Sequence, residues 1–252
     1  MHLQNTAAIV TGAASGLGAA TASALSERGA SVYGLDLPSA IGEAKPTDGV
    51  TLVPADVTDP EQVQDAVESA SADEHPIRTV VNCAGIGPSM RIVGRKGAHD
   101  LAVYRKVVEI NLIGTFNVLT LAAEAIAATD PDDNGQRGVA VNTASIAAYD
   151  GQIGQAAYAS SKGGVVALTL PAARDLASAG IRVCTIAPGI VDTPMLATVS
   201  EEFRAGLAAG IPFPQRLADP AEYARLVTMI VEHDYLNGET IRMDGSLRMA
   251  PR

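Results

Sequence analysis

Residues 11–18 read Thr-Gly-Ala-Ala-Ser-Gly-Leu-Gly, with glycines at positions 12, 16 and 18. This run follows an apolar, strand-like segment at 6–11 and opens a helical pattern at 17–28. Glycines between a strand and a helix let the backbone approach a pyrophosphate group at the helix N-terminus. Small residues are also typical of a tight strand-to-helix turn, so the run alone leaves both interpretations open.

The same alternation of short β-branched runs and longer helical patterns extends along the whole chain. The strand candidates are residues 6–11, 31–36, 50–55, 77–83, 138–144, 181–187 and 239–244. Helical periodicity is clearest over 17–28, 61–72, 101–128, 158–178 and 220–232. Such alternation is typical of parallel sheets, whose crossover helices connect neighbouring strands with one handedness. We therefore predict that residues 1–252 form one α/β domain: a single Rossmann-type doubly wound sheet of seven mainly parallel strands with helices on both faces.

Two irregular stretches, 86–100 and 194–219, are predicted to be inserts within this fold. Both follow the carboxyl ends of strands, where open α/β sheets bind ligands. The first contains Arg91, Arg95 and Lys96, which fit a phosphate-binding loop and a solvated loop without a ligand role. The apolar residues of the second have near-helical spacing, as in a lid over a ligand or an ordinary helix packed on the core: Met195, Leu196, Val199, Phe203 and Leu207.

The composition excludes several classes of protein. The 252-residue chain is 47% hydrophobic and 18% charged, unlike disordered, collagenous or coiled-coil proteins. Its net charge of -10 argues against a general nucleic-acid binder. Cys83 and Cys184 lie in apolar, strand-like runs, so we expect buried, reduced thiols and no disulfide. Because no basic segment precedes an apolar stretch at the N-terminus and no uninterrupted apolar run reaches membrane-spanning length, we expect a soluble, cytoplasmic protein without a membrane span.

Three strand candidates end in residues that can bind a ligand. Asp36 ends the second strand, 24 positions after Gly12, where a carboxylate can accept hydrogen bonds from a ribose. Its charge would repel a 2′-phosphate and therefore favours NAD over NADP, although a turn or helix-cap role for Asp36 is the alternative. Asp56 and Val57 follow the third strand, and the run Asn-Cys-Ala-Gly at 82–85 ends the fourth. Together with the glycine run, these residues predict a dinucleotide site at one edge of the sheet.

A second group of residues predicts proton-transfer chemistry. Tyr158 and Lys162 are four positions apart at the head of a helix, which places both side chains on one face. A free tyrosine has a pKa of about 10, which a nearby cation and a positively charged nicotinamide would both lower, so Lys162 would help Tyr158 to act as a base. Ser145 ends the fifth strand, where its hydroxyl can hold a substrate oxygen or cap the next segment. Asn111 is a polar amide inside an apolar helical pattern, a position at which it can bend the helix and hold a water molecule.

These motifs resemble the short-chain dehydrogenase/reductase family along nearly the whole chain. The resemblance rests on the glycine run, the Asn-Cys-Ala-Gly run, Asn111, Ser145, the run Tyr-Ala-Ser-Ser-Lys at 158–162, Pro188-Gly189 and Thr193-Pro194. Longer runs, such as Gln-Arg-Gly-Val-Ala-Val-Asn-Thr-Ala-Ser at 136–145, are similar to the type-2, short-chain 3-hydroxyacyl-CoA dehydrogenases. Two positions depart from the pattern: Cys83 stands where the wider family usually has asparagine, and Asp192 stands where the close relatives carry a smaller residue.

The resemblance implies a catalytic tetrad of Asn111, Ser145, Tyr158 and Lys162, with Ser145 and Tyr158 touching the substrate and no metal. Tyr158 would be the general base in alcohol oxidation and the general acid in ketone reduction. Lys162 would bind the nicotinamide ribose. The residues implied for NAD binding are Gly12, Ser15, Gly16, Leu17, Gly18, Asp36, Asp56, Val57, Cys83, Ala84, Gly85, Tyr158, Lys162, Pro188, Gly189, Val191 and Thr193.

We therefore predict an NAD-dependent oxidoreductase of fatty-acid metabolism that interconverts 3-hydroxyacyl-CoA and 3-ketoacyl-CoA by hydride transfer. A hydroxysteroid or other secondary-alcohol dehydrogenase of the same family is the first alternative, and a non-catalytic NAD-sensing module is a remote one. The helical segment 101–128 is apolar on more than one face, which predicts a subunit interface. The resemblance implies a homotetramer.

Overall fold

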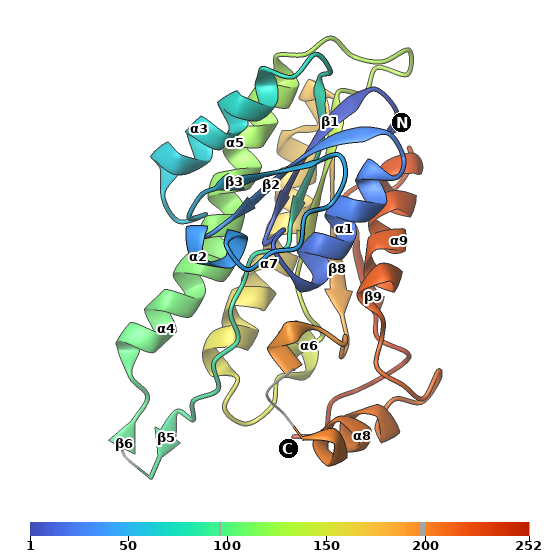
Figure 1. Ribbon diagram of the computed structural model, residues 1–252. Coiled ribbons are helices and arrows are strands. Elements are labelled where there is room, and N and C mark those ends of the chain that lie inside the picture. Colours follow the sequence, from blue (N-terminus) through green and yellow to red (C-terminus); the bar gives the residue numbers. More distant parts are fainter. Residues whose placement is uncertain (96, 197–199, 252) are drawn as a thin grey trace.

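Seven parallel strands form one sheet in the order β3-β2-β1-β4-β7-β8-β9. The computed structural model describes residues 1–95, 97–196 and 200–251 (Figure 1). The strands are β1 (Thr6–Thr11), β2 (Ala30–Asp36), β3 (Val50–Pro54), β4 (Ile77–Asn82), β7 (Gly138–Thr143), β8 (Ile181–Pro188) and β9 (Thr240–Met243). The strand order reverses between β1 and β4, which is the place where a doubly wound sheet opens a crevice for a ligand.

Helices cover both faces of the sheet. The longer ones are α1 (Gly16–Ser26), α3 (Pro60–Ser71), α4 (Leu101–Val108), α5 (Thr115–Ala127), α7 (Ala156–Asp175), α8 (Glu201–Ala209) and α9 (Pro220–Glu232), and the short ones are α2 (Pro38–Ile41) and α6 (Ala147–Asp150). One hydrophobic core lies between the sheet and the helices α3, α5 and α7, and a second lies between the sheet and α1 and α9. Figure 1 shows α3 and α5 on one side and α1 and α9 on the other.

The predicted strands are confirmed, and every strand end agrees with its prediction to within one residue. β1, β7 and β8 are buried along their whole length, because both faces of the sheet are covered by helices. Their apolar, β-branched runs are therefore continuous and easily recognised in the sequence. The predicted α/β fold with helices on both faces is confirmed.

The predicted inserts contain more regular structure than we expected. The first insert forms a two-stranded hairpin, β5 (Val93–Gly94) and β6 (Gly97–Ala98), and the second contains α8. The Ser200 hydroxyl accepts a hydrogen bond from Phe203 N (3.3 Å) and caps α8, so the apolar spacing in this segment does mark a helix. Lys96 and Val199 lie outside the described residues, as does the side chain of Met195.

The helical segment predicted over 101–128 is continuous but not uniformly α-helical. A π-helical segment, η1 (Glu109–Gly114), separates α4 from α5 and contains Asn111. A π-helical turn holds about one residue more than an α-helical turn, so it changes the direction of the side chains that follow. Such segments are frequent at functional sites. The expected disturbance of the helix around Asn111 therefore takes the form of a π segment.

Leu101–Ala127 is the one helical segment in the described part of the chain that is long and apolar enough to span a membrane. Its most apolar 18-residue stretch has a mean hydropathy of 1.5 and is 44% buried inside the protein. Val118, Leu119, Ala122 and Ile126 belong to the core between the sheet and α5. Packing on the sheet accounts for the apolar character of this face, as in many core helices.

Candidate active site

The glycine run forms a close-packed turn between β1 and α1. Gly12 and Gly16 have φ of +67° and +53°, a backbone conformation that glycine adopts without strain. A Cβ atom on Gly18 would lie 2.1 Å from the carbonyl oxygen of Gly12, and one on Gly12 would lie 3.0 Å from Ala84 N. Ser15 is the N-cap residue of α1, and its side chain makes no capping hydrogen bond. The turn therefore presents free helix N–H groups, as a site for a pyrophosphate requires.

Asp36 lies beside this turn at the carboxyl end of β2. Its Oδ2 accepts a hydrogen bond from Ala14 N (2.9 Å), and its Oδ1 accepts one from Leu37 N (2.8 Å). These bonds fix the carboxylate against the loop that would hold a dinucleotide. The residues present thus fit an adenosine ribose with free hydroxyls and would repel a 2′-phosphate at the same place.

The ends of β3 and β4 contribute the next predicted cofactor residues. Asp56 Oδ1 accepts hydrogen bonds from Thr58 N (2.9 Å) and Thr58 Oγ1 (2.8 Å), which turns the chain sharply after β3. Val57 is buried, and a Cβ on Gly114 would lie 2.6 Å from its Cγ2. The structure therefore places the end of β3 directly against the π segment.

The run at 82–85 crosses the gap between the glycine turn and the reaction centre. Thr11 Oγ1 accepts hydrogen bonds from Cys83 N (3.0 Å) and Ala84 N (3.1 Å). On the other side, a Cβ on Gly85 would lie 3.1 Å from Asn111 Oδ1 and 3.5 Å from Lys162 Nζ. A larger residue at position 85 would therefore press on both groups. Both cysteines are free thiols, and Cys184 is buried whereas Cys83 is partly buried.

Ser145, Tyr158 and Lys162 converge at the carboxyl ends of β4 and β7. Ser145 lies two residues beyond β7, is 8% exposed, and accepts a hydrogen bond at Oγ from Ala147 N (3.1 Å). Tyr158 lies in the first turn of α7, and Lys162 follows one turn later. Lys162 Nζ lies 5.9 Å from the centroid of the Tyr158 ring. The predicted phenol and ammonium thus face each other beside a serine hydroxyl.

Burial governs the proton affinities of these two groups. It raises the pKa of the Tyr158 phenol, and only the neighbouring Ser145 hydroxyl acts in the opposite direction. The same effect lowers the pKa of Lys162 to about 8, because an ammonium loses solvation in this position. The sequence interpretation expected Lys162 to lower the pKa of Tyr158. In the structure, loss of solvation is the larger effect, and the pKa of Tyr158 is raised.

Asn111 connects three parts of the site through its side-chain amide. Its Oδ1 accepts a hydrogen bond from Ile86 N (2.8 Å), and its Nδ2 donates to Ile86 O (2.9 Å) and to Ser161 Oγ (3.0 Å). Ser161 Oγ in turn donates to the carbonyl oxygen of Tyr158 (2.8 Å). Asn111 therefore ties the chain after β4 to the helix that carries Tyr158.

The sequence interpretation missed Ser161 and Thr143. Ser161 is fully buried, and Thr143 accepts a hydrogen bond at its carbonyl oxygen from Lys162 Nζ (2.7 Å). Ser161 stands directly before Lys162 in the Tyr-Ala-Ser-Ser-Lys run, and this position is the sequence feature that could have pointed to it. No sequence pattern marks the main-chain oxygen of Thr143, because its partner lies 19 positions away.

The chain after β8 closes the remaining side of the predicted cofactor site. A Cβ on Gly189 would lie 2.9 Å from the Cα of Asp244, and one on Gly16 would lie 3.5 Å from the Cβ of Thr193. Val191 forms an isolated bridge with Ala218. Pro188, Gly189, Val191 and Thr193 thus lie between the sheet edge and the second insert, and Thr193 reaches the glycine turn.

Asp192, the unusual residue in this loop, makes an ion pair with Arg204 of α8 (2.5 Å). The hydrogen bond from Arg204 to Asp192 raises the pKa of the guanidinium. Asp192 N also donates to Ala218 O (2.9 Å). The substitution therefore leaves an ordered loop and adds a charged link between the cofactor side and the second insert.

The C-terminal segment contacts the loop that precedes Tyr158. Arg242 donates from Nη2 to Asp150 Oδ2 (2.6 Å) and from Nε to Asp244 Oδ2 (2.7 Å). Ile153 N donates to the carbonyl oxygen of Pro251 (3.0 Å). These bonds hold the loop that precedes Tyr158 and were not predicted from the sequence.

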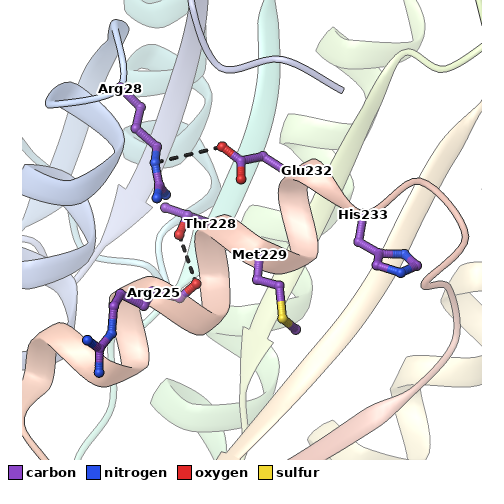
Figure 2. A pocket seen from close by; sticks show the side chains of 6 residues that line it. All are labelled: Arg28, Arg225, Thr228, Met229, Glu232 and His233. Atoms are coloured by element: carbon purple, nitrogen blue, oxygen red, sulfur yellow. Dashed lines mark hydrogen bonds and ion pairs between the residues drawn. The ribbon is translucent and has the colours of Figure 1, made fainter.

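Two pockets lie away from this edge of the sheet. The pocket in Figure 2 has a volume of about 250 Å³ and lies between the end of α1 and the outer face of α9. Arg28 and Glu232 form an ion pair across it at 3.7 Å. A second pocket, of about 470 Å³, is lined by Arg182, Tyr235 and neighbouring polar residues near the amino end of β8. None of the predicted site residues lines either pocket.

The chain is similar to several known proteins. A family model described as short chain dehydrogenase matches residues 6–203. The sequence is 52% identical over 254 residues to a 3-hydroxyacyl-CoA dehydrogenase type-2 of Drosophila melanogaster, and the alignment covers 99% of this chain and 100% of that protein. It is 51% identical over 249 residues to the protein of the same name of Bos taurus, with 97% and 95% covered. The crystal structure of 3-hydroxyacyl-CoA dehydrogenase type-2 from Mycobacterium avium is similar with a TM-score of 0.92 and 44% identity, over 98% of both chains.

Proposed function

The chain belongs to the short-chain dehydrogenase family and is an oxidoreductase, and from this premise we propose that it is an NAD-dependent 3-hydroxyacyl-CoA dehydrogenase. The observation that carries the proposal is the meeting of Ser145, Tyr158 and the buried Lys162 next to Gly85, on the same edge of the sheet as the glycine turn. Oxidoreductases of this family generally use NAD or NADP. The carboxylate of Asp36 beside the glycine turn supports NAD.

The reaction requires a group that exchanges a proton with the substrate oxygen, and Tyr158 is suited to this role. Its phenol would accept the hydroxyl proton of a 3-hydroxyacyl-CoA in oxidation and return it to the ketone in reduction. When bound, the nicotinamide ring supplies the acceptor of the hydride that leaves C3 of the acyl substrate in oxidation, and its donor in reduction. Ser145 would donate a hydrogen bond to the same oxygen, and Lys162 would hold the nicotinamide ribose with N–H groups that Thr143 leaves free.

The CoA part of the proposal is supported by the first insert. Arg91 and Arg95 are exposed on and beside the β5–β6 hairpin, which follows the carboxyl end of β4. Two exposed guanidinium groups on the segment that follows β4, in a protein of net charge -10, would attract the phosphates of CoA. α8 of the second insert exposes 56% of Phe203, an apolar group suited to covering an acyl chain.

A panel of steady-state rates tests the proposal. NADH and NADPH are each combined with acetoacetyl-CoA, its 2-methyl analogue, longer 3-ketoacyl-CoAs and a steroid ketone. We expect NADH to be preferred and acetoacetyl-CoA or a homologue to give the highest kcat/KM. A steroid ketone as the best substrate would instead favour the hydroxysteroid dehydrogenase, and no turnover of any ketone would favour a non-catalytic NAD-sensing module.

The CoA contact is tested separately with charge-neutralising variants. Replacing Arg91, Arg95 and Lys96 by serine should raise KM for acetoacetyl-CoA by about tenfold and leave KM for a steroid ketone unchanged. Replacing Arg105 and Lys106 of α4 together with Arg174 of α7, three cations that are also exposed, is the matched control. Equal effects on both ketones would contradict a CoA contact.

We further propose that the enzyme is a homotetramer. Ile113 and Phe116 are about half exposed on the segment from η1 to α5, and Leu170 is 45% exposed on the outer side of α7. Exposed apolar side chains on the outer sides of two helical segments are suited to a subunit interface. Sedimentation at micromolar concentration tests this, and a monomer would contradict it. The cytoplasmic location and the absence of nucleic-acid and membrane partners stay predictions.

A further inference from the structure

Thr143, the last residue of β7, is held from both faces of the sheet. Its carbonyl oxygen accepts the hydrogen bond from Lys162 Nζ at 2.7 Å. Its Oγ1 shares a hydrogen bond of 2.6 Å with the hydroxyl of Tyr223, which comes from the first turn of α9 on the opposite face. A residue of α9 is therefore two hydrogen bonds away from the buried lysine of the candidate active site.

The hydroxyl of Tyr223 lies in a fully buried position. The side chain has 0% exposure and packs in the core with Val227, Ile230 and the strands. Phenylalanine would fill the same volume without burying a polar group, so the hydroxyl must be compensated by its partners. Those partners are Thr143 Oγ1 and Cys83 Sγ, which lies 3.7 Å from the hydroxyl and 3.7 Å from Thr143 Oγ1.

The position of Thr143 affects two groups of the reaction centre. The main-chain oxygen holds Lys162, and Ser145 follows only two residues later. The bond from Lys162 to this oxygen is the one hydrogen bond that its ammonium makes within the described part of the chain. Rotation of the Thr143 peptide would therefore move the lysine anchor and the serine hydroxyl together.

We propose that Tyr223 is a positioning residue of the active site, which fixes Thr143 from the far face of the sheet and thereby places Lys162 and Ser145. This inference rests on the proposed function for its catalytic consequence. The contacts involve protein groups alone, so they can be tested in the protein without added cofactor. The described titratable groups that face Lys162 are Tyr158 on its own helix and Cys83 at the end of β4, and Tyr223 meets Cys83 from α9.

The test compares variants that remove a hydroxyl with one that keeps it. Tyr223→Phe and Thr143→Val break the shared hydrogen bond, whereas Thr143→Ser keeps Oγ. Tyr33→Phe is the matched control, because the Tyr33 hydroxyl also donates a hydrogen bond, to Asp73 Oδ2 (2.9 Å), but lies on β2 away from Thr143. Thermal melting identifies any variant that is not folded.

Two measurements are made on each folded variant. The first is kcat and KM for NADH and acetoacetyl-CoA; we expect kcat to fall about tenfold in Tyr223→Phe and Thr143→Val, with KM for NADH within about twofold. The second is the titration of Lys162 by ¹⁵N-lysine NMR without cofactor, assigned with Lys162→Arg among the four lysines. A less firmly held Thr143 carbonyl stabilises the Lys162 ammonium less. The midpoint pH of the Lys162 titration should therefore fall in Tyr223→Phe and Thr143→Val and stay unchanged in Thr143→Ser.

The NMR measurement separates this inference from the proposed function. If acetoacetyl-CoA is not a substrate, the proposed function fails, and the Lys162 midpoint still reports whether Tyr223 places the lysine. An unchanged midpoint in Tyr223→Phe would overturn the inference. So would a midpoint change of the same size in Tyr33→Phe, because the effect would then be a general response to a lost hydroxyl.

Discussion

Asn111 Nδ2 donates a hydrogen bond to Ser161 Oγ at 3.0 Å, and this bond joins the π segment to the helix that carries Tyr158 and Lys162. The same amide binds both the N–H and the carbonyl group of Ile86. The π segment therefore does more than interrupt the long helix. It brings a buried amide into a position that fixes the first insert and α7 relative to each other.

Replacing Asn111 by alanine should damage both stability and catalysis. The change leaves the N–H and the carbonyl group of Ile86 without their side-chain partner and removes the hydrogen bond to Ser161 Oγ. Each unsatisfied buried group costs about 1–3 kcal/mol. We expect a free energy of unfolding lower by about 2–4 kcal/mol in urea titrations, together with a lower kcat.

Asn117→Ala is the control for this variant, since Asn117 lies on α5 and its Nδ2 makes a single hydrogen bond to the described residues, to Val57 O (2.9 Å). Its effect on the unfolding free energy should be smaller. Equal losses of stability in the two variants would show that Asn111 makes no special connection.

Tyr158→Phe should abolish turnover but leave NADH binding nearly intact. The variant removes only the phenolic oxygen, which is the group assigned to proton exchange, and keeps the ring in its half-buried place. We expect kcat to fall by at least about 10³-fold in both reaction directions. Fluorescence titration with NADH should give a Kd within about threefold of the parent protein.

Tyr149→Phe supplies the comparison, because the Tyr149 ring is 47% exposed and stacks near Arg242. It should retain most of the activity. Substantial turnover by Tyr158→Phe would remove Tyr158 from the proton transfer.

The local parts of this site could be predicted from the sequence. Tyr158 and Lys162 are one helical turn apart, and Gly12 to Gly18 form one continuous run, so a short window contains the whole pattern. The strands were also predictable, because burial on both faces requires continuous apolar runs such as Gly138–Thr143.

Hydrogen bonds between distant residues could not be predicted in this way. Asn111 lies 50 positions from Ser161, and Thr143 lies 80 positions from Tyr223. Neither pair belongs to a periodic pattern, because the fold alone brings the partners together. The direction of the Tyr158 pKa could not be predicted for a related reason: the sequence shows the neighbouring Lys162 but not the burial that raises the phenol pKa.

Asp36→Asn should weaken the proposed preference for NADH over NADPH. The substitution removes the negative charge beside the glycine turn and keeps an oxygen that can still accept the hydrogen bond from Ala14 N. We expect the ratio of kcat/KM for the two cofactors to shift toward NADPH by about tenfold or more. Asp65→Asn, an exposed site on α3, makes the same change of charge and should leave the ratio unaltered. A ratio that does not move in Asp36→Asn would argue against a ribose contact.

Arg204→Gln should release α8 from the cofactor side of the site. The variant breaks the ion pair with Asp192, which links the loop after β8 to the second insert. Because both partners are partly solvated, the effect on overall stability should be small, within about 1 kcal/mol. The expected change is a higher KM for 3-ketoacyl-CoA with little change in kcat, measured against Arg225→Gln on α9 as the control. Unaltered KM would mean that the ion pair does not hold the insert.

The lowered pKa of Lys162 predicts how stability depends on pH in the cofactor-free protein. The lysine has a pKa of about 8 when folded and an ordinary value of 10.5 when unfolded. Between these values the unfolded chain binds the proton and the folded chain does not, so this group makes the folded state more stable as the pH rises from about 8 to 10.5. Tyr158 acts in the opposite sense above about pH 10, because its pKa is raised on folding.

The contribution of Lys162 is isolated by comparison with Lys162→Met, which has a similar length and no titrating group. Urea unfolding of both proteins between pH 7 and 10 gives the difference in the free energy of unfolding. Lys162→Met should be the more stable protein near pH 7, since it avoids burying an ammonium, and this advantage should shrink as the pH rises past 8. A difference that is constant over this range would show that Lys162 keeps an ordinary pKa in the folded protein. The buried lysine would then need a compensating contact that Thr143 O alone does not supply.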